Sequence, residues 1–147
     1  IIAGIMSKTT LLTLADWDVF VLELLPSLKP GTIIALSGPL GAGKTTFVQA
    51  LARALGISSI PMSPTFSLVR TYPVKQHQSI KKLIHVDAYR LDNEKDVTTL
   101  GLDELLAEEG SLMCLEWPEQ VESWLKNQVK VIRMTIRPEP DGRIVSL

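Results

Sequence analysis

The sequence predicts an α/β fold: a mainly parallel, helix-flanked sheet with antiparallel strands at one edge. Two observations support this fold class. Through most of the chain, short apolar runs that end in glycine or an acidic residue alternate with segments of helical periodicity, as in strands joined by helices. At the C-terminus, VKVIRMTIR (129–137) alternates apolar and polar residues, and PEPDGR then turns the chain into RIVSL. That pattern predicts a closing C-terminal hairpin.

The first half of the chain contains two predicted helices around one predicted strand. Residues 13–28 have apolar residues at helical spacing, and Thr13 with Asp16 forms the start of a capping box. Pro26 is expected to end or kink this helix. The β-branched run at 31–38 predicts a buried strand, and residues 45–55 predict a helix that ends at Gly56.

The second half continues the alternation of strands and helices. One or two short helices are expected around Gly101, within an acidic stretch, and Pro118 is expected in the first turn of the last helix. The predicted strands cover 66–72, 81–87 and 111–117, and the helices lie within 93–108 and 118–125.

Length and composition predict a single domain over residues 1–147. The 147 residues suffice for one core, and 46% hydrophobic with 21% charged residues is ordinary for a globular protein. A net charge of −1 argues against a surface that coats nucleic acid. The one cysteine, Cys114, forms no intrachain disulfide and lies in an apolar run, so we expect a buried strand residue. Two histidines and one cysteine argue against a zinc site with the ordinary number of ligands.

No apolar run reaches the roughly 18 residues that span a bilayer. The apolar opening segment lacks the basic flank of a secretory signal. We therefore expect a protein of the cytoplasm with no membrane partner. Because Met6 follows closely, we also expect that Ile1–Ile5 precede the natural start.

The segment GPLGAGKT (38–45) matches the phosphate-binding pattern G-x-x-x-x-G-K-[ST]. Its glycines let backbone N–H groups converge on phosphate oxygens, and the following helix offers its N-terminus. The lysine can bridge two phosphates, and the threonine hydroxyl can ligate Mg²⁺. A strand before and a helix after the loop predict a P-loop NTPase-type fold. The predicted nucleotide-binding residues are Pro39, Leu40, Gly41, Ala42, Gly43, Lys44, Thr45 and Thr46, with Thr45 also at the metal.

Two acidic residues follow apolar strands, namely Asp87 after LIHV and Glu116 after SLMCL. In an open α/β sheet, the carboxyl ends of parallel strands face one crevice. Both carboxylates can therefore point at the phosphates, and we predict that they act in catalysis.

The segment SPTF (63–66) places Ser63 and Thr65 on a loop constrained by Pro64. Hydroxyls near a γ-phosphate can sense its presence. The sequence leaves open whether this segment belongs to the nucleotide site or is only a turn.

Four segments together resemble the TsaE (YjeE) family of small bacterial P-loop ATPases. GPLGAGKTTF, SPTFSLV, HVDAYRL and LEWPE occur in the order and approximate spacing of that family. The resemblance covers nearly the whole chain from about Thr9.

The resemblance implies an Mg²⁺-dependent ATPase required for threonylcarbamoyladenosine formation on tRNA. It also implies TsaD and TsaB as protein partners, with tRNA met only through that assembly. Carried over by motif, Glu116 would act as the Walker B-like acid at the metal, and Asp87 would lie near the metal or the attacking water. Ser63 and Thr65 would form a switch-like loop. Trp117 would be a nucleotide-site residue, with core packing as the alternative.

The chain departs from the family in two motif positions. Pro39 stands where an acidic residue is usual, and Ala88 replaces a larger apolar residue. His85 belongs to the motif, but chemistry assigns no role to its side chain. It could equally be a histidine that only packs in the core. Thr13 is interpreted as a helix cap in preference to an adenine contact.

Two other functions are alternatives to the ATPase. A small-molecule kinase would need a lid over the phosphates, for which residues 72–81 are the one available segment. A GTP switch would need N-K-x-D and D-x-x-G, which the sequence lacks.

Overall fold

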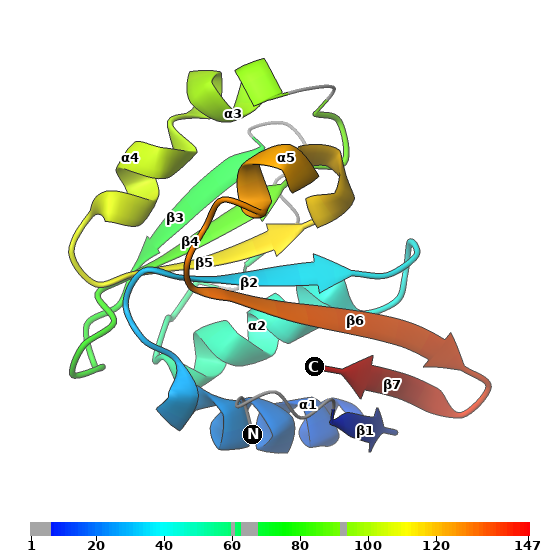
Figure 1. Cartoon of the computed structure of the whole chain (residues 1–147). Coiled ribbons are helices and arrows are strands. Elements are labelled where there is room, and N and C mark those ends of the chain that lie inside the picture. Colours follow the sequence, from blue (N-terminus) through cyan, green and yellow to red (C-terminus); the bar gives the residue numbers. More distant parts are fainter. Residues whose placement is uncertain (1–6, 60, 63–67, 92–93) are drawn as a thin grey trace.

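A seven-stranded sheet forms the centre of the structure, with strand order β1-β7-β6-β2-β5-β4-β3. This computed structural model describes residues 7–59, 61–62, 68–91 and 94–147. Helices cover both faces of the sheet (Figure 1). The prediction of an α/β fold with a helix-flanked sheet is confirmed.

The middle of the sheet is parallel. Strands β6, β2, β5 and β4 are adjacent in that order, and each neighbouring pair is parallel. Strand β5 is buried at every position, as expected for a strand covered on both faces. These four strands cover Val131–Glu139, Thr32–Ser37, Ser111–Glu116 and Lys82–Asp87.

Antiparallel strands lie at both edges of the sheet, whereas the sequence predicted them at one edge only. The predicted C-terminal hairpin is present, with β7 (Gly142–Ser146) against β6. At the other edge, β3 (Val69–Pro73) pairs antiparallel with β4. Beyond β7 lies β1 (Lys8–Leu11), a strand that sequence reasoning missed. Its four residues carry no clear apolar pattern, so its pairing with β7 defines it.

Two hydrophobic cores lie on opposite faces of the sheet. Helices α1 (Leu14–Leu24) and α2 (Lys44–Ala54) pack on one face, where Trp17, Phe20 and Phe47 are in mutual ring contact. The second core includes residues of the smaller helices and the other sheet face. Those helices are α3 (Glu94–Leu100), α4 (Leu102–Ala107), η2 (Pro118–Val121) and α5 (Glu122–Leu125).

The predicted helix boundaries depend on local sequence signals, and most agree with the structure. Thr13 caps α1 in a full capping box with Asp16, an arrangement that typically stabilises a helix by about 1 kcal/mol. Pro26 lies in η1 (Leu25–Ser27), a 3-10 turn that ends the helix. The segment after Trp117 differs from the prediction, because it begins as the 3-10 helix η2 and only then becomes α5.

Cys114 is fully buried in β5, as predicted. Burial and the nearby Glu116 carboxylate raise the pKa of its thiol. None of the helices in the described ranges is long and apolar enough to cross a bilayer.

The loop after β2 passes close to the neighbouring strand β6. Gly38 has a φ of 155°, and a Cβ built on it would lie 2.5 Å from the carbonyl oxygen of Ile136. Gly41 has a φ of 75°, but a Cβ there would meet nothing within 4 Å. The first loop glycine is therefore required by packing as well as by backbone conformation, whereas Gly41 is required by conformation alone.

We expect Gly38→Ala to lower the free energy of unfolding clearly more than Gly41→Ala. The second variant carries only the cost of a left-handed non-glycine residue, about 1–2 kcal/mol. The first adds a backbone clash, for which overpacking typically costs a further 1–3 kcal/mol. Urea denaturation of both variants measures the difference, and equal losses would contradict the packing explanation.

Candidate functional site

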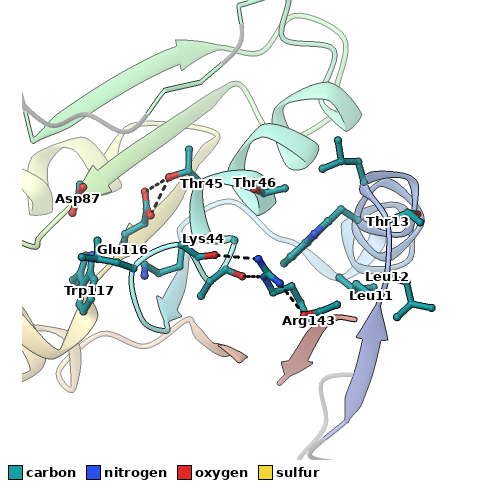
Figure 2. A pocket seen from close by; sticks show the side chains of 17 residues that line it. Leu11, Leu12, Thr13, Lys44, Thr45, Thr46, Asp87, Glu116, Trp117 and Arg143 are labelled. Carbon is teal, nitrogen blue, oxygen red and sulfur yellow. Dashed lines mark hydrogen bonds between the residues drawn. The ribbon is translucent and has the colours of Figure 1, made fainter. Parts of the chain in front are cut away.

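A cavity of about 520 Å³ lies where the parallel strands reach their carboxyl ends. Three parts of the chain line it: the loop 40–46, the strand-end residues Asp87, Glu116 and Trp117, and an edge formed by residues 11–14 with Arg143 (Figure 2). These parts are far apart in sequence, and the sheet topology brings them together.

The glycine-rich loop leads directly into helix α2. Gly43 is the N-cap, and the backbone N–H of Phe47 donates to its carbonyl at 2.9 Å. Gly43 has a φ of 115°, which disfavours any side chain, and a Cβ there would approach the buried Trp17 ring of α1 to 3.0 Å. The first turn of α2 thus presents its unpaired N–H groups at the cavity, an arrangement suited to an anion.

Lys44 is held inside the loop. Its ammonium donates to the carbonyl oxygens of Gly38 at 2.5 Å and Pro39 at 2.9 Å, and lies 4.2 Å from the centre of the Trp117 ring. Burial lowers the pKa of Lys44 below its ordinary value, while the charge of Glu116 opposes that shift. An anionic group in the cavity would also favour the charged ammonium.

Thr45 and Glu116 meet across the cavity floor. The Thr45 hydroxyl lies 3.2 Å from Oε1 and 3.3 Å from Oε2 of Glu116 (Figure 2). Asp87 is the register partner of Glu116 on the adjacent parallel strand, and its Oδ1 accepts the backbone N–H of Tyr89 at 3.0 Å. Glu116 and Asp87 are only 3% and 9% exposed. Both strand-end acids line the same cavity.

Glu116 has a second close partner that sequence reasoning did not assign. Nε2 of His85 lies 2.5 Å from Glu116 Oε2, and the histidine is fully buried. Strand alternation already places residues 85 and 87 on one face, but the contact with Glu116 depends on the register between β4 and β5.

Trp117 lies between the cavity and the second hydrophobic core. Its ring lines the cavity and also packs against the second hydrophobic core. Its φ is 59°, and its backbone N–H donates to Leu36 at 3.3 Å, which places the ring beside Lys44. The Tyr89 ring lies 5.0 Å from it.

The opposite side of the cavity is apolar. Thr13 caps α1, as the sequence predicted. The same residue also lines the cavity. Leu12, Leu14 and Leu40 are more than half exposed at the mouth of the cavity. Such a surface suits a flat apolar group such as a base.

Arg143 of β7 was missed by sequence reasoning. Its guanidinium donates to the carbonyls of Ala42 at 2.8 Å, Gly41 at 3.3 Å and Gly142 at 2.9 Å (Figure 2). The closing hairpin therefore fixes the back of the glycine-rich loop. No local motif indicates an arginine in this role, because its two partners in the loop, Ala42 and Gly41, are 101 and 102 residues away in the sequence.

The remaining predicted residues have different placements. Thr46 lines the cavity, and Pro39 contributes its carbonyl to Lys44. Ser63 and Thr65 lie outside the described residues. Across the described ranges, no group of three or more histidine, cysteine, aspartate or glutamate side chains is arranged to hold a metal. A site built from one hydroxyl and one carboxylate instead suits Mg²⁺, which keeps several waters and takes phosphate oxygens as ligands.

Comparison with known proteins identifies the family. Residues 13–145 match the family described as threonylcarbamoyl adenosine biosynthesis protein TsaE. A TsaE protein of Treponema pallidum is 36% identical over 131 residues, covering 88% of this chain and 90% of that protein. One of Bacillus subtilis is 41% identical over 101 residues, covering 68% of this chain but 59% of that protein.

A solved structure agrees with the fold. The crystal structure of Bacillus subtilis YdiB superimposes with a TM-score of 0.73 at 26% identity, covering 97% of this chain and 84% of that chain. With the matched family region spanning nearly the whole sequence, the chain belongs to the TsaE family of threonylcarbamoyl adenosine biosynthesis proteins.

Proposed function

We propose that this chain binds Mg²⁺ and ATP and hydrolyses the nucleotide as a subunit of tRNA threonylcarbamoyladenosine biosynthesis in the cytoplasm. The observation that carries the proposal is the convergence of Lys44, Thr45 and Glu116 at the carboxyl ends of β2 and β5. The relatives are named for that biosynthesis, and nucleotide hydrolysis is the chemistry that this convergence suits.

Phosphate binding is assigned to the loop and to the start of α2. Backbone N–H groups of the first helical turn supply donors, and the helix dipole favours negative charge there. The Lys44 ammonium is already turned into the loop, where its hydrogen bonds go to neutral carbonyls. A phosphate oxygen is a stronger partner for an ammonium than a carbonyl, so we expect Lys44 to contact the phosphates.

Magnesium is assigned to Thr45 and Glu116. Both offer hard oxygen ligands, and their oxygens already lie 3.2–3.3 Å apart. When bound, the ion would neutralise phosphate charge and stabilise the charge that develops during transfer. Glu116 and Asp87 are both close enough to the cavity to orient an attacking water.

The base is assigned to the apolar side of the cavity. Trp17 and the leucines of residues 11–14 border this side, and Arg143 also lines the cavity. An aromatic base gains dispersion and stacking energy on such surfaces.

The placement of residues 74–81 argues against the kinase alternative. This segment joins β3 to β4, and the register partner of Pro73 is Lys82, the first residue of β4. It therefore lies at the amino end of β4 (Figure 1), whereas Asp87 is the last residue of the same strand and lines the cavity. A lid over the phosphates would have to come from the opposite end of the sheet.

The partner assignment is tested by hydrolysis assays. We expect slow release of phosphate from Mg²⁺ and ATP by the chain alone, and faster release when TsaD, TsaB and tRNA are added. Phosphate release that the partners leave unchanged would contradict the assembly. Robust phosphorylation of a small metabolite would overturn the ATPase in favour of a kinase.

We expect Lys44→Ala to weaken nucleotide binding. A hydrogen bond to a charged group contributes about 1.5–3 kcal/mol, which corresponds to a roughly 10- to 150-fold higher Kd. Isothermal titration calorimetry with ATP measures the change. Lys126→Ala removes an exposed lysine of the same charge and serves as the control. An unchanged Kd for Lys44→Ala would remove this residue from the site.

We expect Glu116→Gln to bind nucleotide but to hydrolyse it at least about 100-fold more slowly. Losses of this size follow removal of one group that stabilises charge in a transition state. Steady-state phosphate release and a separate binding titration measure the two effects. Glu109→Gln removes an exposed carboxylate that does not line the cavity, and we expect it to behave as the unmodified chain. Wild-type hydrolysis in Glu116→Gln would exclude that carboxylate from the mechanism.

A further inference from the structure

The buried pair of His85 and Glu116 lies below the proposed nucleotide site. We propose that His85 is a positioning residue, which holds the Glu116 carboxylate toward Thr45 by donating a hydrogen bond from Nε2. This inference rests on the proposed Mg²⁺-dependent ATPase function, and it adds a residue whose role no motif assigns.

The sheet places His85 directly behind Glu116. On β4, Ile84 and Val86 belong to the core with the smaller helices, so His85 points to the opposite face, where α2 packs. The register partner of His85 on β5 is Cys114, two residues before Glu116. His85 therefore lies one step deeper along the strands than the carboxylate.

Both carboxylate oxygens of Glu116 contact Thr45, and Oε2 has His85 as a further partner. Oε2 lies 2.5 Å from His85 Nε2, while the Thr45 hydroxyl approaches both oxygens at 3.2 and 3.3 Å. With Oε2 held by the histidine, the carboxylate loses its freedom to rotate. Oε1 then stays close to Thr45 at the cavity, where it can contact a cation or a water molecule.

The surroundings of the ring assign its tautomer. Nδ1 of His85 is buried and has no hydrogen-bond partner among the described residues. A proton on Nδ1 would leave a buried donor unsatisfied, and a bare Nε2 would set two acceptors 2.5 Å apart. Both points place the ring proton on Nε2, which donates it to the carboxylate.

His85 acts through Glu116 because it does not reach the cavity. The residue is fully buried and is absent from the cavity lining. It cannot touch a nucleotide or its phosphates. Partners of this kind, which orient a ligating group, typically change metal affinity or activity by about 10- to 100-fold when they are removed.

The first experiment observes the pair in the free protein. We expect ¹⁵N and ¹H spectra of the histidine rings to show a strongly downfield proton on Nε2 of His85. That signal should be lost in Glu116→Ala and retained in Cys114→Ala, which alters a buried neighbour on the same face. An Nδ1–H tautomer, or a signal that Glu116→Ala leaves unchanged, would overturn the proposal without any measurement of activity.

The second experiment compares hydrolysis in matched variants. His85→Leu removes the donor at similar volume, and we expect kcat to fall about 10- to 100-fold, with little change in the Kd for ATP measured without Mg²⁺. His85→Gln keeps a side-chain N–H donor and should recover most of this loss. A loss in His85→Leu no larger than that in Cys114→Ala would show that the histidine only packs.

A double variant shows whether His85 acts through the carboxylate. In a Glu116→Gln background, His85→Leu should cost less than about threefold more, because residues in one network are not additive. Fully additive losses would overturn the proposal. Absence of ATP hydrolysis by the unmodified chain, with and without partners, would instead refute the proposed function, and the ring spectra would still decide the pair.

Discussion

The burial of one carboxylate constrains much of this structure. Glu116 is 3% exposed at the end of β5, and a buried charge is costly unless it is paired and hydrogen-bonded. Its partners come from two other elements, Thr45 at the start of α2 and His85 in β4. The requirement to satisfy this carboxylate therefore ties the glycine-rich loop, the helix that follows it and two central strands into one arrangement.

The glycine-rich loop is held from outside as well as by its own backbone. Ile136 of β6 leaves no room for a side chain at Gly38, and Trp17 of α1 leaves little at Gly43. Arg143 of β7 binds the loop carbonyls. The phosphate-binding pattern explains Gly38 and Gly43 by convergent N–H groups. Close packing is a second reason for glycine at both positions. The antiparallel edge of the sheet is part of the site and does more than close the fold.

Local signals predicted most elements because they act over a few residues. The capping box of Thr13 and Asp16, the stop at Gly56 and the apolar runs of β2, β4 and β5 all depend on near neighbours. Strand β1 has no such signal, since three of its four residues are not fully buried and its ladder with β7 determines it. The 3-10 turn after Trp117 begins directly after a residue with a left-handed backbone, a conformation that no local sequence signal predicted.

The sequence by itself determined the phosphate loop and the two strand-end acids, because spacing and strand order suffice to place them at one crevice. Only the tertiary structure decided which side chains complete the site. His85 and Glu116 are 31 residues apart, and Arg143 lies 101 residues from Ala42. Such pairs depend on register between strands and on the burial of each group. Local propensities do not determine strand register or burial, because both are defined only once the sheet has formed.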